Sequence, residues 1–474
     1  MEKNKELIKN TIIILLGKFC TQFLSFFLLP LYTTILSANE YGIYDLIVTY
    51  VALFVPVISL QMEMAIFREL IDVRGNCKKT SEIISSGIFS VILQFIICFI
   101  CYYLISVFIN IPYKNYIIIN ILAVMVSSIF MQIARGLGQN VQYSISSVIA
   151  GVSTILLNIL FLVILKFNVE GMIISAILSN IFAAIYIFIS CKLYKKIKYS
   201  SVSKQIIHKL LKYSLPLVPN GLIWWIINVS DRTIISIFLG TGANGIYAVS
   251  NKFSSILMQI FNIFNLSWTE SASLHINDED KNEFFSGVFN KTLKYSLVVC
   301  LLIIAALPFL FNILISQSYR EAYVYIPILL IGMIFNIIVS FLGSIYVSKK
   351  LTKEVAKTSF CAGVLNILIN VFLVKYIGIF AAAISTLLAF LIMSIFRIVD
   401  VQKYVKLKIN FKEINMALLL FLISLLLYYF NNTFISAIYL ALIIAYIFID
   451  NKNYINLILK KIKNQAKKNR LFVK

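Results

Sequence analysis

Residues 83–109 read IISSGIFSVILQFIICFICYYLISVFI and contain no charged side chain. A helix needs about 20 apolar residues to cross the hydrocarbon core of a bilayer, so this stretch predicts a transmembrane helix. Similar runs follow one another along the chain and predict an all-α polytopic membrane protein with about fourteen spans. The predicted spans are residues 11–36, 42–66, 83–109, 114–134, 143–166, 169–191, 213–239, 244–268, 292–315, 322–347, 355–375, 378–399, 413–430 and 434–449.

The overall composition supports a membrane location and excludes several soluble classes. The chain has 474 residues, of which 60% are hydrophobic and 13% charged, with a mean hydropathy of +0.92. A soluble protein of this composition could not cover its surface with polar groups. The net charge of +22 does not indicate nucleic acid, because the lysines and arginines lie between the apolar runs and suit anionic lipid headgroups.

The distribution of basic residues predicts the orientation in the membrane. Of the 42 lysines and arginines, 35 lie on one side of the predicted spans, four on the other and three within spans. Loops rich in lysine and arginine face the cytoplasm, so both termini are expected there and the number of spans is expected to be even. The mixed-charge segment 1–10 is interpreted as the lead into the first span rather than as a signal peptide.

Short sequence words recur in the second half of the chain. Residues 36–44 (LSANEYGIY) resemble residues 239–247 (LGTGANGIY), and the word Ala-Gly-Val at 150–152 recurs at 362–364. The repeat predicts two six-helix lobes in parallel orientation, with a substrate cavity between lobes that rock. The predicted divisions are a first lobe at 1–200, a second lobe at 201–405, and two further helices with a basic tail at 406–474.

Polar side chains within the spans mark the candidate substrate site. Lys18 and Gln22 share one face of the first span, which indicates a water-lined cavity, although Lys18 could instead reach the cytoplasmic headgroups. Asp231 and Arg232 lie in the seventh span, and Lys252 lies at a similar depth in the eighth. The single carboxylate leaves excess positive charge that suits an anionic ligand; the alternative is an ion-paired cluster that joins the two spans. The candidate substrate-binding residues are Lys18, Gln22, Asn228, Asp231, Arg232, Lys252, Gln259 and Asn262.

Three carboxylates are candidates for coupling transport to a proton or sodium ion. They are Asp45, Glu63 and Asp231, and nothing in the sequence selects one of them. For Glu63 the alternative is a solvated cytoplasmic helix end. Three asparagines in the fifth and eleventh spans are interpreted as hydrogen-bonding links between helices: Asn158, Asn366 and Asn370.

The sequence predicts no catalytic or metal site and no other cofactor. His208 and His275 fall in different predicted cytoplasmic loops, without a nucleophile at a recognisable spacing. Cys98 and Cys101 form a CxxC pair, but it lies inside an apolar run and has no partner pair. The predicted outer loops hold only a handful of residues each, which argues against a membrane-embedded polymerase or ligase.

Several short motifs of the sequence resemble motifs of the Wzx-type polysaccharide flippases of the MOP exporter superfamily. The resemblance covers roughly residues 5–400. Asp231 and Arg232 match a motif of that family residue by residue, whereas Lys18 and Lys252 rest on the burial argument alone. The matching words are LGK at 16–18, LPLY at 29–32, EYGIY at 40–44, YSLPLVP at 213–219, NVSDR at 228–232, GIY at 245–247 and GIFAAAI at 378–384.

The resemblance implies a function, a location and partners. It implies a MATE-like fold of two lobes and two added C-terminal helices, with a central cavity lined by helices 1, 2, 7 and 8. It implies movement of undecaprenyl-diphosphate-linked oligosaccharide repeat units across the bacterial cytoplasmic membrane, with membrane lipids, a polysaccharide polymerase and chain-length proteins as partners. The alternative within the superfamily is a multidrug or cation exporter, which a positively charged cavity fits poorly.

Overall fold

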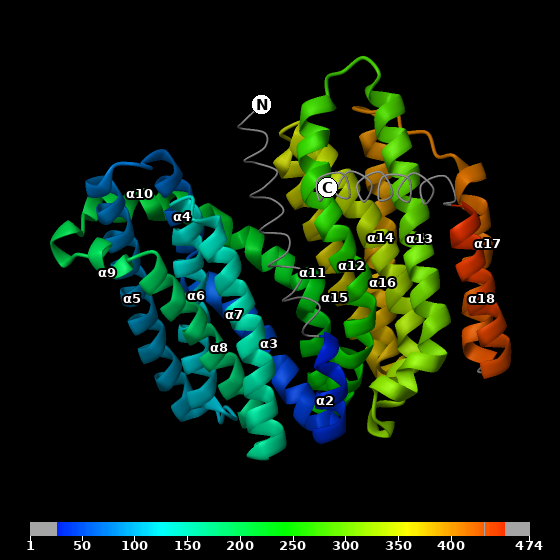
Figure 1. Cartoon of the computed structure of the whole chain (residues 1–474), viewed down its shortest axis with the longest axis horizontal. Helices are drawn as coiled ribbons and strands as arrows, with labels where there is room; N and C mark the ends of the chain where they lie inside the picture. The colour runs from blue at the N-terminus through cyan, green and yellow to red at the C-terminus, as the bar shows by residue number, and fades with distance from the viewer. Residues whose placement is uncertain (1–25, 431, 451–474) are drawn as a thin grey trace, which may run out of the picture. The chain divides into compact units, whose positions relative to one another are not determined.

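The computed structural model describes residues 26–430 and 432–450, and every regular element in these ranges is a helix (Figure 1). Within them, nine helices are long and apolar enough to cross a membrane. The prediction of an all-α polytopic membrane protein is confirmed. The nine are α3 (Ala38–Ile58), α5 (Cys77–Phe108), α6 (Lys114–Gly136), α7 (Asn140–Asn158, continued by the π-helix η1, Ile159–Ile164), α8 (Val169–Ser190), α13 (Lys281–Leu314), α14 (Ala322–Ser348), α15 (Thr352–Ile377) and α16 (Phe380–Val401).

The remaining helices are shorter or carry more polar side chains. Two long ones, α11 (Val218–Leu239) and α12 (Thr241–His275), hold the charged residues of the predicted seventh and eighth spans. The others are α2 (Leu29–Ile35), α4 (Met62–Asp72), α9 (Leu193–Lys196), α10 (Lys204–Ser214), α17 (Phe411–Phe430) and α18 (Thr433–Asp450), with 3-10 turns η2 (Tyr199–Ser201), η3 (Leu215–Leu217) and η4 (Gln317–Tyr319).

The prediction of one continuous span at 42–66 is wrong, because the structure divides this segment into two helices. Helix α3 ends at Ile58 and α4 begins at Met62. Between them Leu60 and Gln61 have positive φ angles of 49° and 57°. Pro56 precedes the break, and proline weakens a helix because its ring lacks an N–H and crowds the preceding turn. The Gln61 N–H reaches back to Pro56 O (3.1 Å), which ends α3 in a widened turn.

The chain forms two compact units, and each is described by itself. The first comprises Met1–Lys252, Ile315–Leu329 and Lys350–Met393; the second comprises Phe253–Leu314, Leu330–Lys349 and Ser394–Lys474. In the first, α6, α7 and α8 pack side by side, and α10 packs against α4 and α5 (Figure 1). In the second, α17 and α18 pack against α13. The predicted division at residues 200 and 405 stays a prediction.

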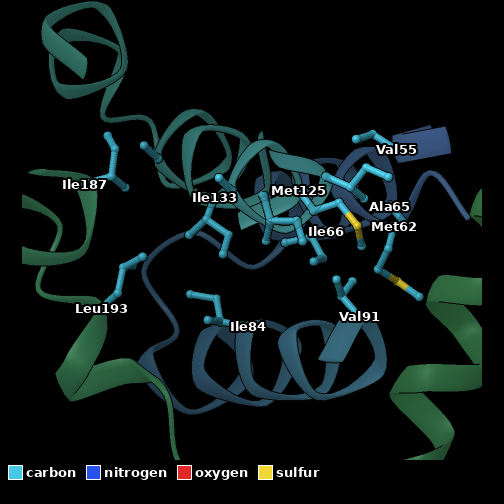
Figure 2. Packing of buried hydrophobic residues seen from close by; sticks show 14 of the residues in the cluster. Val55, Met62, Ala65, Ile66, Ile84, Val91, Met125, Ile133, Ile187 and Leu193 are labelled. Carbon is cyan, nitrogen blue, oxygen red and sulfur yellow. The ribbon is translucent and has the colours of Figure 1, made fainter. Parts of the chain in front are cut away.

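A cluster of aliphatic side chains holds the helices of the first unit together. Figure 2 shows Ile84 and Val91 of α5 facing Met62 and Ile66 of α4, and these side chains are almost fully buried. Gly87 on the same face of α5 lets the helices approach, because a Cβ there would lie 2.5 Å from Ile66 Cδ1. In a bilayer such contacts stabilise mainly through van der Waals packing, and small residues favour them. The same cluster includes Ile47 of α3 and Ile177 of α8, so it also links α4 and α5 to these two helices.

Candidate functional site

The N-terminal ends of α3 and α12 cross at two glycines that belong to the repeated sequence words. A Cβ on Gly42 would lie 1.8 Å from Thr241 O, and a Cβ on Gly245 would lie 2.0 Å from Ala38 O. The repeat aligns Ala38 with Thr241 and Gly42 with Gly245. The contact is therefore reciprocal, as expected for a two-fold relation between the repeated words. This finding supports the predicted internal repeat.

A capping motif in the sequence begins α3 at Ala38, close to this crossing. Ser37 caps the helix, because its Oγ accepts from Glu40 N (3.3 Å) while Glu40 Oε2 accepts from Ser37 N (2.9 Å). From α12, Asn244 Nδ2 donates to Gly42 O (3.0 Å) and to Asp45 Oδ2 (3.3 Å). The crossing thereby orients the Asp45 carboxylate, three residues after Gly42 on α3.

A cavity of about 320 Å³ lies in the first unit, beside Asp45. Helices α2, α3, α7, α8, α11 and α12 contribute to it. Its charged lining residues are Arg232, Lys252 and Asp45, so two cations face one carboxylate and the formal charge is positive. The remaining lining residues are Leu28, Tyr32, Tyr41, Tyr44, Val48, Ala150, Gly151, Thr154, Ser179 and Asn180.

Arg232 forms the ion pair of this cavity. Its Nη1 donates to Asp45 Oδ1 (3.0 Å) and to Thr49 Oγ1 (3.2 Å), and its side chain stays 20% exposed. Its Nε is buried and has no hydrogen-bond partner within residues 26–430 and 432–450. The pair joins α11 to α3, whereas the alternative reading of the sequence expected it to join the seventh and eighth spans. An arginine with an unsatisfied donor beside a cavity is suited to an anionic ligand.

Asp231, the preceding residue, lies in a different environment. It is 3% exposed and is absent from the cavity lining. Its carboxylate accepts from Tyr247 OH (3.0 Å), Asn370 Nδ2 (2.9 Å) and Thr386 Oγ1 (2.6 Å). The Asn366 amide fits its surroundings when its nitrogen donates to Asp231 Oδ1 (3.0 Å). Four neutral donors from α12, α15 and α16 thus enclose the carboxylate.

The interpretation of the asparagines as links between helices is confirmed for two of the three. Asn366 and Asn370 on α15 both reach Asp231 on α11. Asn158 does not fit that interpretation, because its Nδ2 donates to Thr154 O of its own helix (2.7 Å). A short amide side chain commonly satisfies itself on the carbonyl one turn before it.

Five of the other predicted site residues cannot be placed in the cavity. Lys18 and Gln22, as well as the side chain of Asn228, lie outside the described part of the structure. Gln259 and Asn262 continue the polar face of α12, but they belong to the second unit. Their part in substrate binding stays a prediction.

Glu63 lies at the break between α3 and α4. It is buried, and Ser59 Oγ donates to its Oε2 (2.9 Å). It is not among the residues that line the cavity. The alternative of a solvated cytoplasmic helix end is wrong, because the side chain is buried within the first unit.

Sequence reasoning missed the polar residues of α7 and α8 that line the cavity. These are Thr154, Ser179 and Asn180, together with Gly151. One signal was present, because Gly151 belongs to the repeated word Ala-Gly-Val and Thr154 follows it by three residues on the same helical face. Serine and threonine are common in membrane helices, however, so residue type alone did not set these apart.

Comparison with known proteins shows where this fold and sequence recur. A family model described as polysaccharide biosynthesis protein matches residues 7–269, more than half of the chain. No curated protein sequence matches. The structure of the lipid II flippase MurJ in an inward closed conformation is similar, with a TM-score of 0.68, 18% identity, and coverage of 95% of this chain and 100% of that one.

Two structures of MOP superfamily transporters are also similar. An outward-facing multidrug resistance MATE family transporter gives a TM-score of 0.57 at 12% identity, covering 83% of this chain and 93% of that one. A transporter from Pyrococcus furiosus, described as having a binding pocket of reversed polarity, gives 0.53 at 11% identity, covering 84% and 96%. At these identities the likeness concerns the fold.

Proposed function

Since the chain belongs to the polysaccharide biosynthesis protein family, we propose that it is a flippase for undecaprenyl-diphosphate-linked oligosaccharide repeat units. It would move them from the inner to the outer leaflet of the bacterial cytoplasmic membrane for assembly of a surface polysaccharide. The observation that carries the proposal is the positively charged cavity, where Arg232 and Lys252 face the single carboxylate of Asp45.

The chemistry of such a substrate matches this cavity. A diphosphate is strongly anionic and accepts hydrogen bonds, and arginine and lysine carry only donors. Among the described residues, nothing accepts a hydrogen bond from the Arg232 Nε, which lies beside the ion pair with Asp45. The lipid chain is apolar and can remain in the bilayer while the headgroup crosses. Alternating access by rocking of the two predicted lobes would then expose the cavity to each side in turn.

The enclosed carboxylate of Asp231 supports a role in ion coupling. A charged group at membrane depth is expensive and tends to be functional. All four of its donors are neutral, and Asn366, Asn370 and Thr386 each also carry an oxygen that side-chain rotation would turn toward a cation. A proton on the carboxylate is the simpler alternative. Comparing transport across a sodium gradient with transport across a pH gradient distinguishes the two.

The cavity charge disfavours the other transport function. A multidrug exporter of cationic compounds would need a neutral or negative binding site, because like charges repel at close range. We therefore expect no efflux of cationic dyes above background from cells that overproduce the protein. Efflux that Asp45→Asn abolishes would favour the exporter instead.

A depletion experiment tests the proposed flippase function. In a strain that lacks the protein, undecaprenyl-linked repeat units should accumulate on the cytoplasmic face, and surface glycan should disappear. The wild-type gene should restore both. Normal surface glycan without trapped intermediate would overturn the proposal. When the gene is returned to this strain, reporter fusions at the two ends of the protein test the proposed cytoplasmic location of both termini.

Physical partners follow from the same proposal. A polysaccharide polymerase and chain-length proteins would receive the repeat units at the outer leaflet. Crosslinking in cells that make the polysaccharide would capture these proteins with the flippase if the units are handed over directly.

A further inference from the structure

The cavity that holds Arg232 and Lys252 presents a second set of polar groups, from α7 and α8. We call Gly151, Thr154, Ser179 and Asn180 the α7–α8 face; all four line the cavity. Helices α7 and α8 pack directly against each other, so these residues form a continuous surface. None of them is charged.

Hydrogen bonds within each helix decide what the α7–α8 face offers to a ligand. Thr154 Oγ1 donates to Ala150 O (2.8 Å), and Ser179 Oγ donates to Ala176 O (3.0 Å). Asn180 Nδ2 also donates to Ala176 O (2.8 Å). A hydroxyl that donates its only hydrogen keeps two lone pairs, and the amide keeps its oxygen and one N–H. In the described part of the chain no donor reaches these oxygens, so the face is rich in acceptors.

The cations on α11 and α12 have the opposite hydrogen-bonding character. Arg232 and Lys252 are donors without lone pairs to offer. A diphosphate has acceptors and no donor at neutral pH, so it binds well to these cations and poorly to acceptor oxygens. Sugar hydroxyls can donate to acceptors. One small cavity therefore carries two chemically different binding surfaces.

The size of the cavity limits how much of a substrate these surfaces contact. At about 320 Å³ it lies at the lower end of the range for small-molecule sites. It has room for a diphosphate and one sugar, but not for a whole repeat unit. Gly151 has no side chain, so a sugar ring can approach the backbone of α7 there.

We propose that the α7–α8 face binds the first sugar of the lipid-linked unit while Arg232 and Lys252 bind its diphosphate. This inference rests on the proposed function. The headgroup then has one orientation in the cavity, with its phosphates toward α11 and α12 and its sugar toward α7 and α8. Thr154 and Asn180 act as specificity-determining residues for the sugar that is attached to the diphosphate.

Two binding probes separate this inference from the proposed function. The full-length protein in lipid nanodiscs is titrated with undecaprenyl diphosphate, and separately with undecaprenyl diphosphate that carries one N-acetylhexosamine. The test variants are Thr154→Val combined with Asn180→Leu, and Arg232→Gln alone. Ser175→Ala is the matched control, because Ser175 Oγ makes the same kind of bond on α8 (to Gly171 O, 2.7 Å) and does not line the cavity.

The expected result is a selective loss. The double variant should bind the glycosylated lipid about tenfold more weakly, from the loss of two hydrogen bonds, and should bind undecaprenyl diphosphate as the wild type does. Arg232→Gln should weaken both lipids, and Ser175→Ala should weaken neither. The wild-type protein is also titrated with lipids that carry different sugars. The assignment gains further support if the affinity of the wild type depends on the sugar and the affinity of the double variant does not.

Three outcomes would contradict the inference in distinguishable ways. If the double variant binds both lipids normally while Arg232→Gln weakens both, the α7–α8 face has no part in sugar binding and the proposed function stands. If the double variant weakens both lipids equally, the assigned orientation is wrong. If the wild-type protein binds neither lipid, the proposed function itself fails.

Discussion

Asp231 and Arg232 are consecutive residues of α11, yet their charges are stabilised in opposite ways. Successive residues of an α-helix point about 100° apart, so the two side chains meet different helices. Asp231 is enclosed by neutral donors and has no contact with the cavity. Arg232 lines the cavity, pairs with Asp45 of α3 and keeps an unpaired Nε among the described residues.

The difference indicates which group is suited to an external ligand. A carboxylate whose acceptors are all occupied by protein donors gains little from a large ligand. A guanidinium with one counter-ion and an unused donor gains directly from an anion. Charge alone would have treated the two residues as one site.

Removing the enclosed carboxylate should have the largest effect on stability. Asp231→Ala leaves four buried donors without their acceptor, and each such group costs about 1–3 kcal/mol. We expect the free energy of unfolding in detergent to fall by about 3 kcal/mol or more, measured by denaturation of the purified protein. Asp231→Asn is the control, because it keeps the shape and an acceptor oxygen. If Asp231→Ala is as stable as the wild type, the donors do not depend on the carboxylate.

Removing the cavity arginine should affect transport more than stability. Arg232→Ala leaves Asp45 with Asn244 as its neighbour and should cost about 2 kcal/mol, as for loss of a hydrogen bond to a charged group. Glycan export should be abolished, with protein still present in the membrane. Lys252→Ala should also abolish export. Export that continues in either variant would remove that residue from the anion site.

The glycine crossing that orients Asp45 offers a smaller and more local test. Gly42→Ala places a methyl group against Thr241 O and should destabilise by about 1–2 kcal/mol, because the helices must separate. Gly287→Ala on α13 is the matched control, since no atom lies within 4 Å of a Cβ there. The control should be neutral or slightly stabilising. Equal effects at both glycines would mean that the close contact is not required.

Removing one donor from the enclosed carboxylate should have the smallest effect. Thr386→Val keeps the volume but removes the hydroxyl that donates to Asp231 Oδ2. Because three donors remain, the expected loss is about 1 kcal/mol, measured by thermal denaturation. If Asp231 couples transport to an ion, the concentration of sodium or protons for half-maximal transport should shift as well. If the thermal stability falls but the ion concentration for half-maximal transport is unchanged, the hydrogen bonds around Asp231 have only a structural role.

The membrane spans were readable from the sequence because hydrophobicity is a local property. The predicted span 169–191 coincides with α8 (Val169–Ser190) to within a residue at each end. The break at Leu60 and Gln61 was missed, since Pro56 alone does not distinguish a kink from two separate helices. The candidate charges Asp45, Asp231 and Arg232 were also found, because any ionisable residue in an apolar run stands out.

The partners of those charges were decided by tertiary structure alone. Arg232 meets Asp45 across 187 residues of sequence, and Asp231 meets Asn370 and Thr386 across 139 and 155. Local pattern sets the depth of a side chain and its helical face. Which neighbour it meets there depends on which helices pack together. The sequence by itself determined only that each buried charge needs a partner, because an unpaired charge at membrane depth is unfavourable.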